Sequence, residues 1–89
     1  MIYNLKNKQL RIGENNIINL TDLEHRFLIS ISTNQYEKTK DIKKFILNRE
    51  INFNYNLSIL KYRFVKKTGL LIVTKNGYGY KLINKINFE

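Results

Sequence analysis

The sequence contains no cysteine, no proline and no tryptophan, and only one histidine and seven acidic residues among its 89 positions. Without cysteine the chain can form neither disulfides nor thiolate metal sites, so a reducing compartment suits it. No apolar run approaches the roughly 20 residues that a membrane-spanning helix needs. The first residues, MIYNLKNKQL, also lack the apolar segment of a signal peptide. These absences favour a small cytoplasmic domain.

The same scarcities argue against an enzyme. His25 has no cysteine to partner it, and the carboxylates do not pair at catalytic or metal-ligand spacing. We therefore expect no catalytic residues, no metal and no cofactor. His25 is expected to be a solvated residue of a helix, whereas Asp22 and Glu24 suit the positive N-terminal end of that helix.

Positive charge is what the sequence has in excess. Sixteen lysines and arginines against seven acidic residues give a net charge of +9. No Asp or Glu falls between residues 54 and 88, where seven of the basic residues lie. An AT-rich genome enriches lysine but also glutamate, so base composition explains only part of this excess. A field of one sign favours a polyanionic partner, with nucleic acid ahead of an acidic protein or a membrane surface.

The hydrophobic pattern predicts a single domain over residues 1–89. Residues 1–20 contain three brief β-prone runs that polar turns separate, at residues 2–5, 10–12 and 17–20. Thr21 and Glu24 then have the spacing of a capping box, which predicts a helix that ends near Asn34.

Two more helices are expected in residues 21–69. The second runs from Thr39 to about Asn48, and its apolar face is formed by Ile42, Phe45 and Ile46. The third lies within FNYNLSILKYRFVKKTG and ends at Gly69. Its core stripe is Phe53, Leu57, Leu60 and Phe64, and its opposite face carries Tyr55, Ile59, Tyr62 and Lys66.

A hairpin is expected over residues 70–83, followed by a tail at residues 84–89. Residues 70–73 and 80–83 are apolar strand candidates, and the Asn76-Gly77 pair between them is typical of a hairpin turn. Short strands, three helices and a hairpin are together the element order of an α+β winged helix-turn-helix.

Three motifs carry a resemblance to a known family across essentially the whole chain. Residues 20–24 read LTDLE, residues 74–80 read TKNGYGY, and the third helix has the apolar spacing described above. In these features the sequence resembles the DNA-binding domain of bacterial OmpR/PhoB-type response regulators, which act in two-component systems, and of their ToxR-like relatives. Both an excised C-terminal domain and a stand-alone protein are compatible with this resemblance.

The resemblance implies sequence-specific binding of double-stranded DNA by a transcription regulator, with the third helix in the major groove and the hairpin wing on the adjacent groove or backbone. The residues expected nearest the bases are Tyr55, Asn56, Ser58, Ile59 and Tyr62. Phosphate contacts are expected from Lys61, Arg63, Lys66 and Lys67. The wing contributes Lys75, Asn76, Gly77, Tyr78 and Lys81, and the resemblance packs Tyr80 beneath the third helix.

Some features depart from the family. The reading face lacks the arginines with which many relatives bind guanine, and Asn76 stands where the wing usually has arginine. In relatives the loop between the second and third helices can contact RNA polymerase, but the corresponding residues 48–52 are few. RNA polymerase and a homodimer on DNA are left as further candidate partners.

Two other functions fit the same residues. A winged helix can be a protein-interaction module, here through the outward Tyr55–Ile59–Tyr62 stripe, because a fold does not fix a function. In that case the stripe docks a partner protein or a second copy of the chain. A separate alternative is that these three side chains are buried against something else, so that the third helix is apolar on two sides. RNA binding is a third reading, and it is weaker because the sequence indicates no stacking platform on a sheet.

Overall fold

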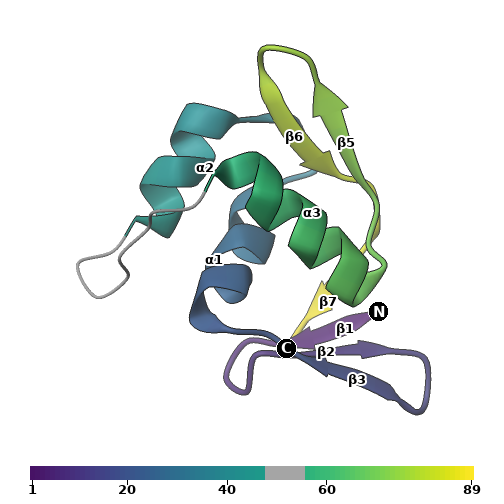
Figure 1. The fold of residues 1–89 in the computed structure, drawn as a ribbon. Coiled ribbons are helices and arrows are strands. Elements are labelled where there is room, and N and C mark those ends of the chain that lie inside the picture. The colour runs from purple at the N-terminus through teal and green to yellow at the C-terminus, as the bar shows by residue number, and fades with distance from the viewer. Residues whose placement is uncertain (48–55) are drawn as a thin grey trace.

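The computed structural model describes residues 1–47 and 56–89 (Figure 1). Its elements in chain order are β1 (Ile2–Asn4), β2 (Gln9–Ile12), β3 (Asn16–Asn19), α1 (Asp22–Ile31), β4 (Glu37–Lys38), α2 (Thr39–Ile46), α3 (Leu57–Thr68), β5 (Ile72–Lys75), β6 (Gly79–Leu82) and β7 (Asn87–Phe88). The three helices and two sheets in these ranges confirm the predicted α+β class. The described residues do not include the predicted loop at residues 48–52, nor do they include Phe53 and Tyr55 of the predicted third helix.

The first sheet has the strand order β3-β2-β1-β7. Its first three strands form an antiparallel meander at the predicted positions, with Leu10 opposite both Tyr3 and Ile18. Residues 84–89, predicted as a tail, instead include β7, which pairs in parallel with β1 so that Ile2 faces Asn87. A two-residue strand has no periodicity of its own, and its partner lies at the far end of the sequence, so no local pattern indicates it.

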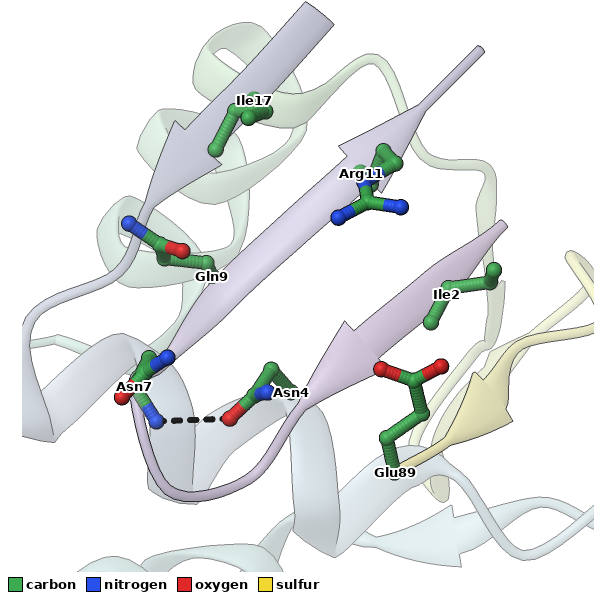
Figure 2. A pocket seen from close by; sticks show the side chains of 7 residues that line it. All are labelled: Ile2, Asn4, Asn7, Gln9, Arg11, Ile17 and Glu89. Carbon is green, nitrogen blue, oxygen red and sulfur yellow. Dashed lines mark hydrogen bonds between the residues drawn. The ribbon is translucent and has the colours of Figure 1, made fainter. Parts of the chain in front are cut away.

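One face of this sheet is buried, and the other is open to solvent and carries mainly polar side chains together with Ile2 and Ile17. Tyr3 and Leu10 are fully buried, and the alternation of side chains along a strand puts Gln9 and Arg11 on the opposite face. There they help to line a shallow pocket of about 100 Å³ (Figure 2). Glu89 also lines it, because its backbone N–H donates to the Tyr3 carbonyl at 2.9 Å and holds the last residue beside β1.

The predicted capping box opens α1. The Glu24 N–H donates to the Thr21 hydroxyl at 3.2 Å, and the Thr21 N–H donates to the Glu24 carboxylate at 2.9 Å. The helix ends at Ile31, earlier than predicted, and Ser32 follows as its C-cap residue. Asn34 then adopts a left-handed backbone with φ of 64°, which no helix accommodates.

Helix α2 begins at Thr39 as predicted and ends at Ile46. Ile42 and Ile46 are buried, whereas Phe45, predicted on the same face, is 47% exposed. The buried side of α2 is therefore a single narrow row of residues spaced four apart. Phe45 follows Ile42 by three residues, so its side chain lies at the edge of this row.

Helix α3 packs its predicted stripe into the centre of the domain. Leu57, Leu60 and Phe64 are buried, and Gly69 ends the helix with φ of 73°. The Phe64 ring meets the Phe27 ring of α1 edge to face, with 5.1 Å between centroids. With 12 residues α3 is the longest helix of the described ranges, and no helix there is long and apolar enough to span a bilayer.

The second sheet has the order β4-β6-β5 and stands beside the N-terminal half of α3 (Figure 1). Its β5–β6 hairpin is shorter than predicted: Leu70 is buried in the core, Leu71 is exposed, and pairing begins at Ile72. Gly77 makes the turn with φ of 71°, a backbone conformation that side chains disfavour.

Strand β4 was not predicted, and it depends on Gly79. Lys38 of β4 pairs with Gly79 of β6, and a Cβ at residue 79 would overlap the backbone of Glu37. Only glycine lets the two backbones approach this closely. Thr39 strengthens the same junction, because its N–H donates to the Tyr78 carbonyl at 3.1 Å.

We expect Gly79→Ala to separate β4 from β6 and to lower the free energy of unfolding by about 1–3 kcal/mol, as overpacking does. Urea titration measures the loss, and amide hydrogen exchange should show reduced protection of the Thr39 N–H. Gly13→Ala is the matched control, because a Cβ there meets nothing within 4 Å although φ is 76°. Its Thr39 protection should equal that of the wild type; unchanged protection in Gly79→Ala would contradict the steric argument.

His25 is half-buried, contrary to the expectation of a solvated helix residue. The Tyr3 hydroxyl lies 2.5 Å from Nδ1 of His25 and forms a hydrogen bond with it. Burial, with a smaller contribution from the Lys8 ammonium, lowers the pKa of His25 despite the opposing charge of Asp22. Burial also raises the pKa of Tyr3 to about 12. Both groups are therefore neutral in the folded domain near pH 7.

Because the pKa of His25 is lower in the folded chain, the unfolded chain takes up the proton first as the pH falls. Stability should be complete above the ordinary histidine pKa of about 6.5 and decline below it. Urea titrations at about pH 7.5 and about pH 5.5 bracket this value and stay above the ordinary carboxylate range. His25→Gln should show a smaller decline over this interval than the wild type. An equal decline would mean that another group titrates.

Candidate nucleic-acid interface

The solvent-facing side of α3 exposes an apolar and aromatic strip. Ile59 is 46% exposed and Tyr62 is 63% exposed, one turn apart, with Ser58 exposed beside them. These two side chains are therefore not buried against the rest of the domain. The strip exists because Leu57, Leu60 and Phe64 occupy the core side of the helix and turn the remaining residues outward.

Asn56 caps α3. Its side-chain oxygen accepts a hydrogen bond from the Ser58 N–H at 2.9 Å, and its backbone is extended as N-cap geometry requires. A bidentate contact of Asn56 with adenine uses the amide nitrogen together with this same oxygen, so base reading and capping would share the oxygen. Its proposed reading role stays a prediction, as does that of Tyr55, which lies outside the described residues.

The basic residues of α3 differ in what they contact. Lys61 donates to the Thr74 hydroxyl at 2.8 Å and lies 5.0 Å from the Tyr80 ring, so it joins α3 to the second sheet. Lys66 is exposed and its ammonium lies 5.7 Å from the ring of Tyr62. Arg63 is exposed on the same helix. Lys66 and Arg63 therefore border the Ile59–Tyr62 strip, whereas Lys61 is directed toward the second sheet.

Lys67 belongs to the scaffold. Its ammonium donates to the Glu24 carboxylate at 2.7 Å, and so it links the end of α3 to the capping box of α1. Burial acts to raise the pKa of Glu24, but the hydrogen bonds from Lys67 and from the Thr21 backbone outweigh burial and hold this pKa below its ordinary value. A phosphate contact by Lys67 would therefore have to break an existing ion pair.

The neighbouring lysines 66 and 67 allow a paired test of this difference. Lys67→Met keeps most of the aliphatic stem but removes the charge, and we expect the free energy of unfolding to fall by about 1 kcal/mol. Lys66→Met should change it by less than about 0.5 kcal/mol, as exposed substitutions usually do. Urea titration at neutral pH measures both. Equal effects of the two variants would show that the Glu24 ion pair contributes nothing specific.

Three of the residues predicted for a wing, Lys75, Tyr78 and Lys81, gather on the face of the second sheet that points away from α3. Thr74 and Tyr80 face α3, as their contacts with Lys61 require. Their strand neighbours Lys75 and Lys81 therefore point to the opposite face. The ammonium groups there lie 5.0–5.8 Å from tyrosine rings. We call this cluster the tyrosine–lysine face, and its members are Tyr36, Lys38, Lys75, Tyr78 and Lys81.

Tyr36 and Lys38 were not predicted as site residues. Tyr36 precedes β4 and Lys38 lies within it, on either side of Glu37. The two-residue alternation of a strand puts both side chains on the same face. That alternation is too short to identify a strand by itself. The other wing residues lie where the hairpin predicts: Asn76 and Gly77 form the exposed turn, and Tyr80 is buried next to α3.

No family model, curated protein or solved structure matches the chain. Function is therefore inferred from the arrangement of two surfaces: the Ile59–Tyr62 strip with its basic border, and the tyrosine–lysine face.

Proposed function

We propose that this chain is a winged-helix domain that binds double-stranded DNA sequence-specifically as a transcription regulator, with α3 in the major groove. The observation that carries the proposal is the exposed strip of Ser58, Ile59 and Tyr62 on a helix whose other side is anchored in the core. A major groove admits one α-helix, whose outward residues then meet base edges. The isoleucine suits thymine methyl groups, and the serine hydroxyl suits either a donor or an acceptor on a base.

The elements around α3 support this geometry. The β5–β6 hairpin follows α3 directly and is joined to it by the Lys61–Thr74 hydrogen bond, so the two are held as one unit. A hairpin fixed beside the reading helix is what a wing needs in order to reach the adjacent groove or backbone. Asn76 and Gly77 form the exposed tip of this hairpin.

Electrostatics support the same partner. The chain carries a net charge of +9, and none of its acidic residues lies between residues 54 and 88. Lys66 and Arg63 are exposed beside the strip. Of the basic residues on α3, they are therefore the best placed to contact phosphates. Lys61 and Lys67 rank lower as phosphate contacts, because each already has a partner within the domain.

We also propose that the domain acts by binding and not by catalysis. Its one histidine, His25, is half-buried and bonded to the Tyr3 hydroxyl, so it supports the junction of β1 and α1. The resemblance to OmpR/PhoB-type domains agrees with a binding role and remains part of the proposal.

A protein-interaction module is the second candidate, and the observation that favours it is the apolar character of the same strip. Ile59 and Tyr62 are large, exposed and adjacent, and aromatic residues are enriched in protein interfaces. The two candidates differ in their response to salt, because releasing counterions from phosphates weakens DNA binding steeply whereas an apolar contact is little affected.

The test is fluorescence anisotropy of a labelled random-sequence duplex over a series of salt concentrations. We expect a dissociation constant of about 10⁻⁴–10⁻⁶ M that rises steeply with salt. Lys66→Ala should weaken binding to all duplexes and reduce the slope of log affinity against log salt by about one, because one phosphate contact is lost. Ile59→Ala should leave the slope unchanged and alter the sequences that are selected from a random pool.

Lys6→Ala is the charge-matched control, because Lys6 lies in the β1–β2 turn of the other sheet. It removes the same charge and should leave the slope nearly unchanged. No binding at low salt, or equal slopes for the wild type and Lys66→Ala, would reject the role of α3 in DNA binding. In the first case the protein-interaction module becomes the preferred function.

A further inference from the structure

The tyrosine–lysine face combines exposed aromatic rings with concentrated positive charge. Tyr36 and Tyr78 keep 37% and 38% of their surface exposed. The Lys75 ammonium lies 5.8 Å from the centre of the Tyr36 ring and 5.0 Å from that of Tyr78, so one cation contacts both rings. Lys81 lies 5.7 Å from Tyr36, and Lys38 lies 5.8 Å from Tyr78.

Among the residues that the structure describes, the ammonium groups of this face lie over aromatic rings and form no ion pair with a carboxylate. Glu37 stands between Tyr36 and Lys38 in the sequence, but alternation along the strand sends its side chain to the other face. There its carboxylate accepts hydrogen bonds from Thr33 at 2.7 Å and Gln35 at 3.1 Å. Three ammonium groups are therefore held together by the negative faces of rings, which leaves their full charge for a ligand.

We propose that the tyrosine–lysine face binds single-stranded nucleic acid. Bases stack on Tyr36 and Tyr78, while Lys38, Lys75 and Lys81 hold the phosphates between them. Aromatic side chains among cations are what such binding requires, because every base has a face to stack and every nucleotide carries one negative charge. A duplex does not offer unstacked bases, so it cannot use the rings in this way.

The ligand would replace the contacts that the face makes with itself. A phosphate draws each ammonium away from the ring that it covers, and the released ring surface becomes available to a base. Base stacking contributes about 5- to 150-fold in affinity for each ring, which exceeds the effect of an exposed cation–ring contact. The exchange therefore favours the bound state, and binding weakens as salt rises.

This site lies on the other face of the second sheet from α3, the helix proposed for the major groove, although Lys75, Tyr78 and Lys81 belong to the hairpin proposed as the wing. Thr74 and Tyr80 occupy the inner face of the second sheet next to Lys61 of α3, whereas the tyrosine–lysine face is the outer one. The inference goes beyond the proposed function and does not depend on it, because substitutions can affect one surface and leave the other intact.

The test compares tyrosine-to-leucine variants, which keep apolar bulk but remove the ring. A labelled oligoadenylate of about 12 nucleotides, prepared as DNA and as RNA, is titrated by anisotropy with each variant. Tyr36→Leu and Tyr78→Leu should each weaken its binding about fivefold or more. Phe45→Leu is the matched control, because it removes an exposed ring from α2, outside both proposed surfaces, and should leave oligonucleotide binding unchanged. The two oligonucleotides distinguish DNA from RNA as the natural ligand.

The wild type provides a second readout that needs no substitution. The sequence has no tryptophan, so its intrinsic fluorescence comes from tyrosine, and stacking of the oligonucleotide should quench it. Oligonucleotide binding that survives both Tyr36→Leu and Tyr78→Leu, or binding without quenching, would overturn the proposal. So would a parallel loss of random-duplex binding in these two variants, since the face would then be part of the duplex interface.

Discussion

The packing of Phe27 is the contact on which the rest of the structure depends. Its ring is fully buried and meets Phe64 of α3 edge to face at 5.1 Å and Tyr80 of β6 at 6.4 Å. One side chain of α1 thus sets the position of both the candidate reading helix and the central strand of the second sheet. Edge-to-face aromatic pairs prefer a defined geometry, so this contact fixes orientation as well as excluding water. The two candidate surfaces inherit their relative arrangement from it.

The lysines around this core divide into two groups, although the sequence does not distinguish them. The ammonium groups of Lys61 and Lys67 each donate a hydrogen bond to a partner within the domain and so connect α3 to its neighbours. Lys66 and Lys75 lie over tyrosine rings at the surface. A ring holds a cation without neutralising it, whereas a carboxylate such as Glu24 does neutralise it. The net charge of the chain is therefore a poor guide to which lysines meet a ligand.

Those parts of the fold that depend on neighbouring residues could be predicted from the sequence. The capping box of Thr21 and Glu24 and the stripe of Leu57, Leu60 and Phe64 are encoded within a few positions, and the structure has them. Strands β4 and β7 were missed, because two residues have no measurable period and their partners are distant in the sequence. The candidate site follows the same division. Exposure of Ile59 and Tyr62 follows from helical periodicity, whereas Tyr36 joins Lys75 only through tertiary pairing.

The parallel pairing of β7 with β1 has a consequence for the order in which the chain folds. Ile2 and Asn87 come from opposite ends of the printed sequence, and closing so long a loop costs more entropy than any hairpin in the domain. Of the described strands, β1 is synthesised first and β7 last, so β1 lacks this neighbour until all the others have been made. Until then its hydrogen-bonding edge is open, and an open edge is the usual route to pairing between chains. The shortest strand of the first sheet thus covers the edge of β1.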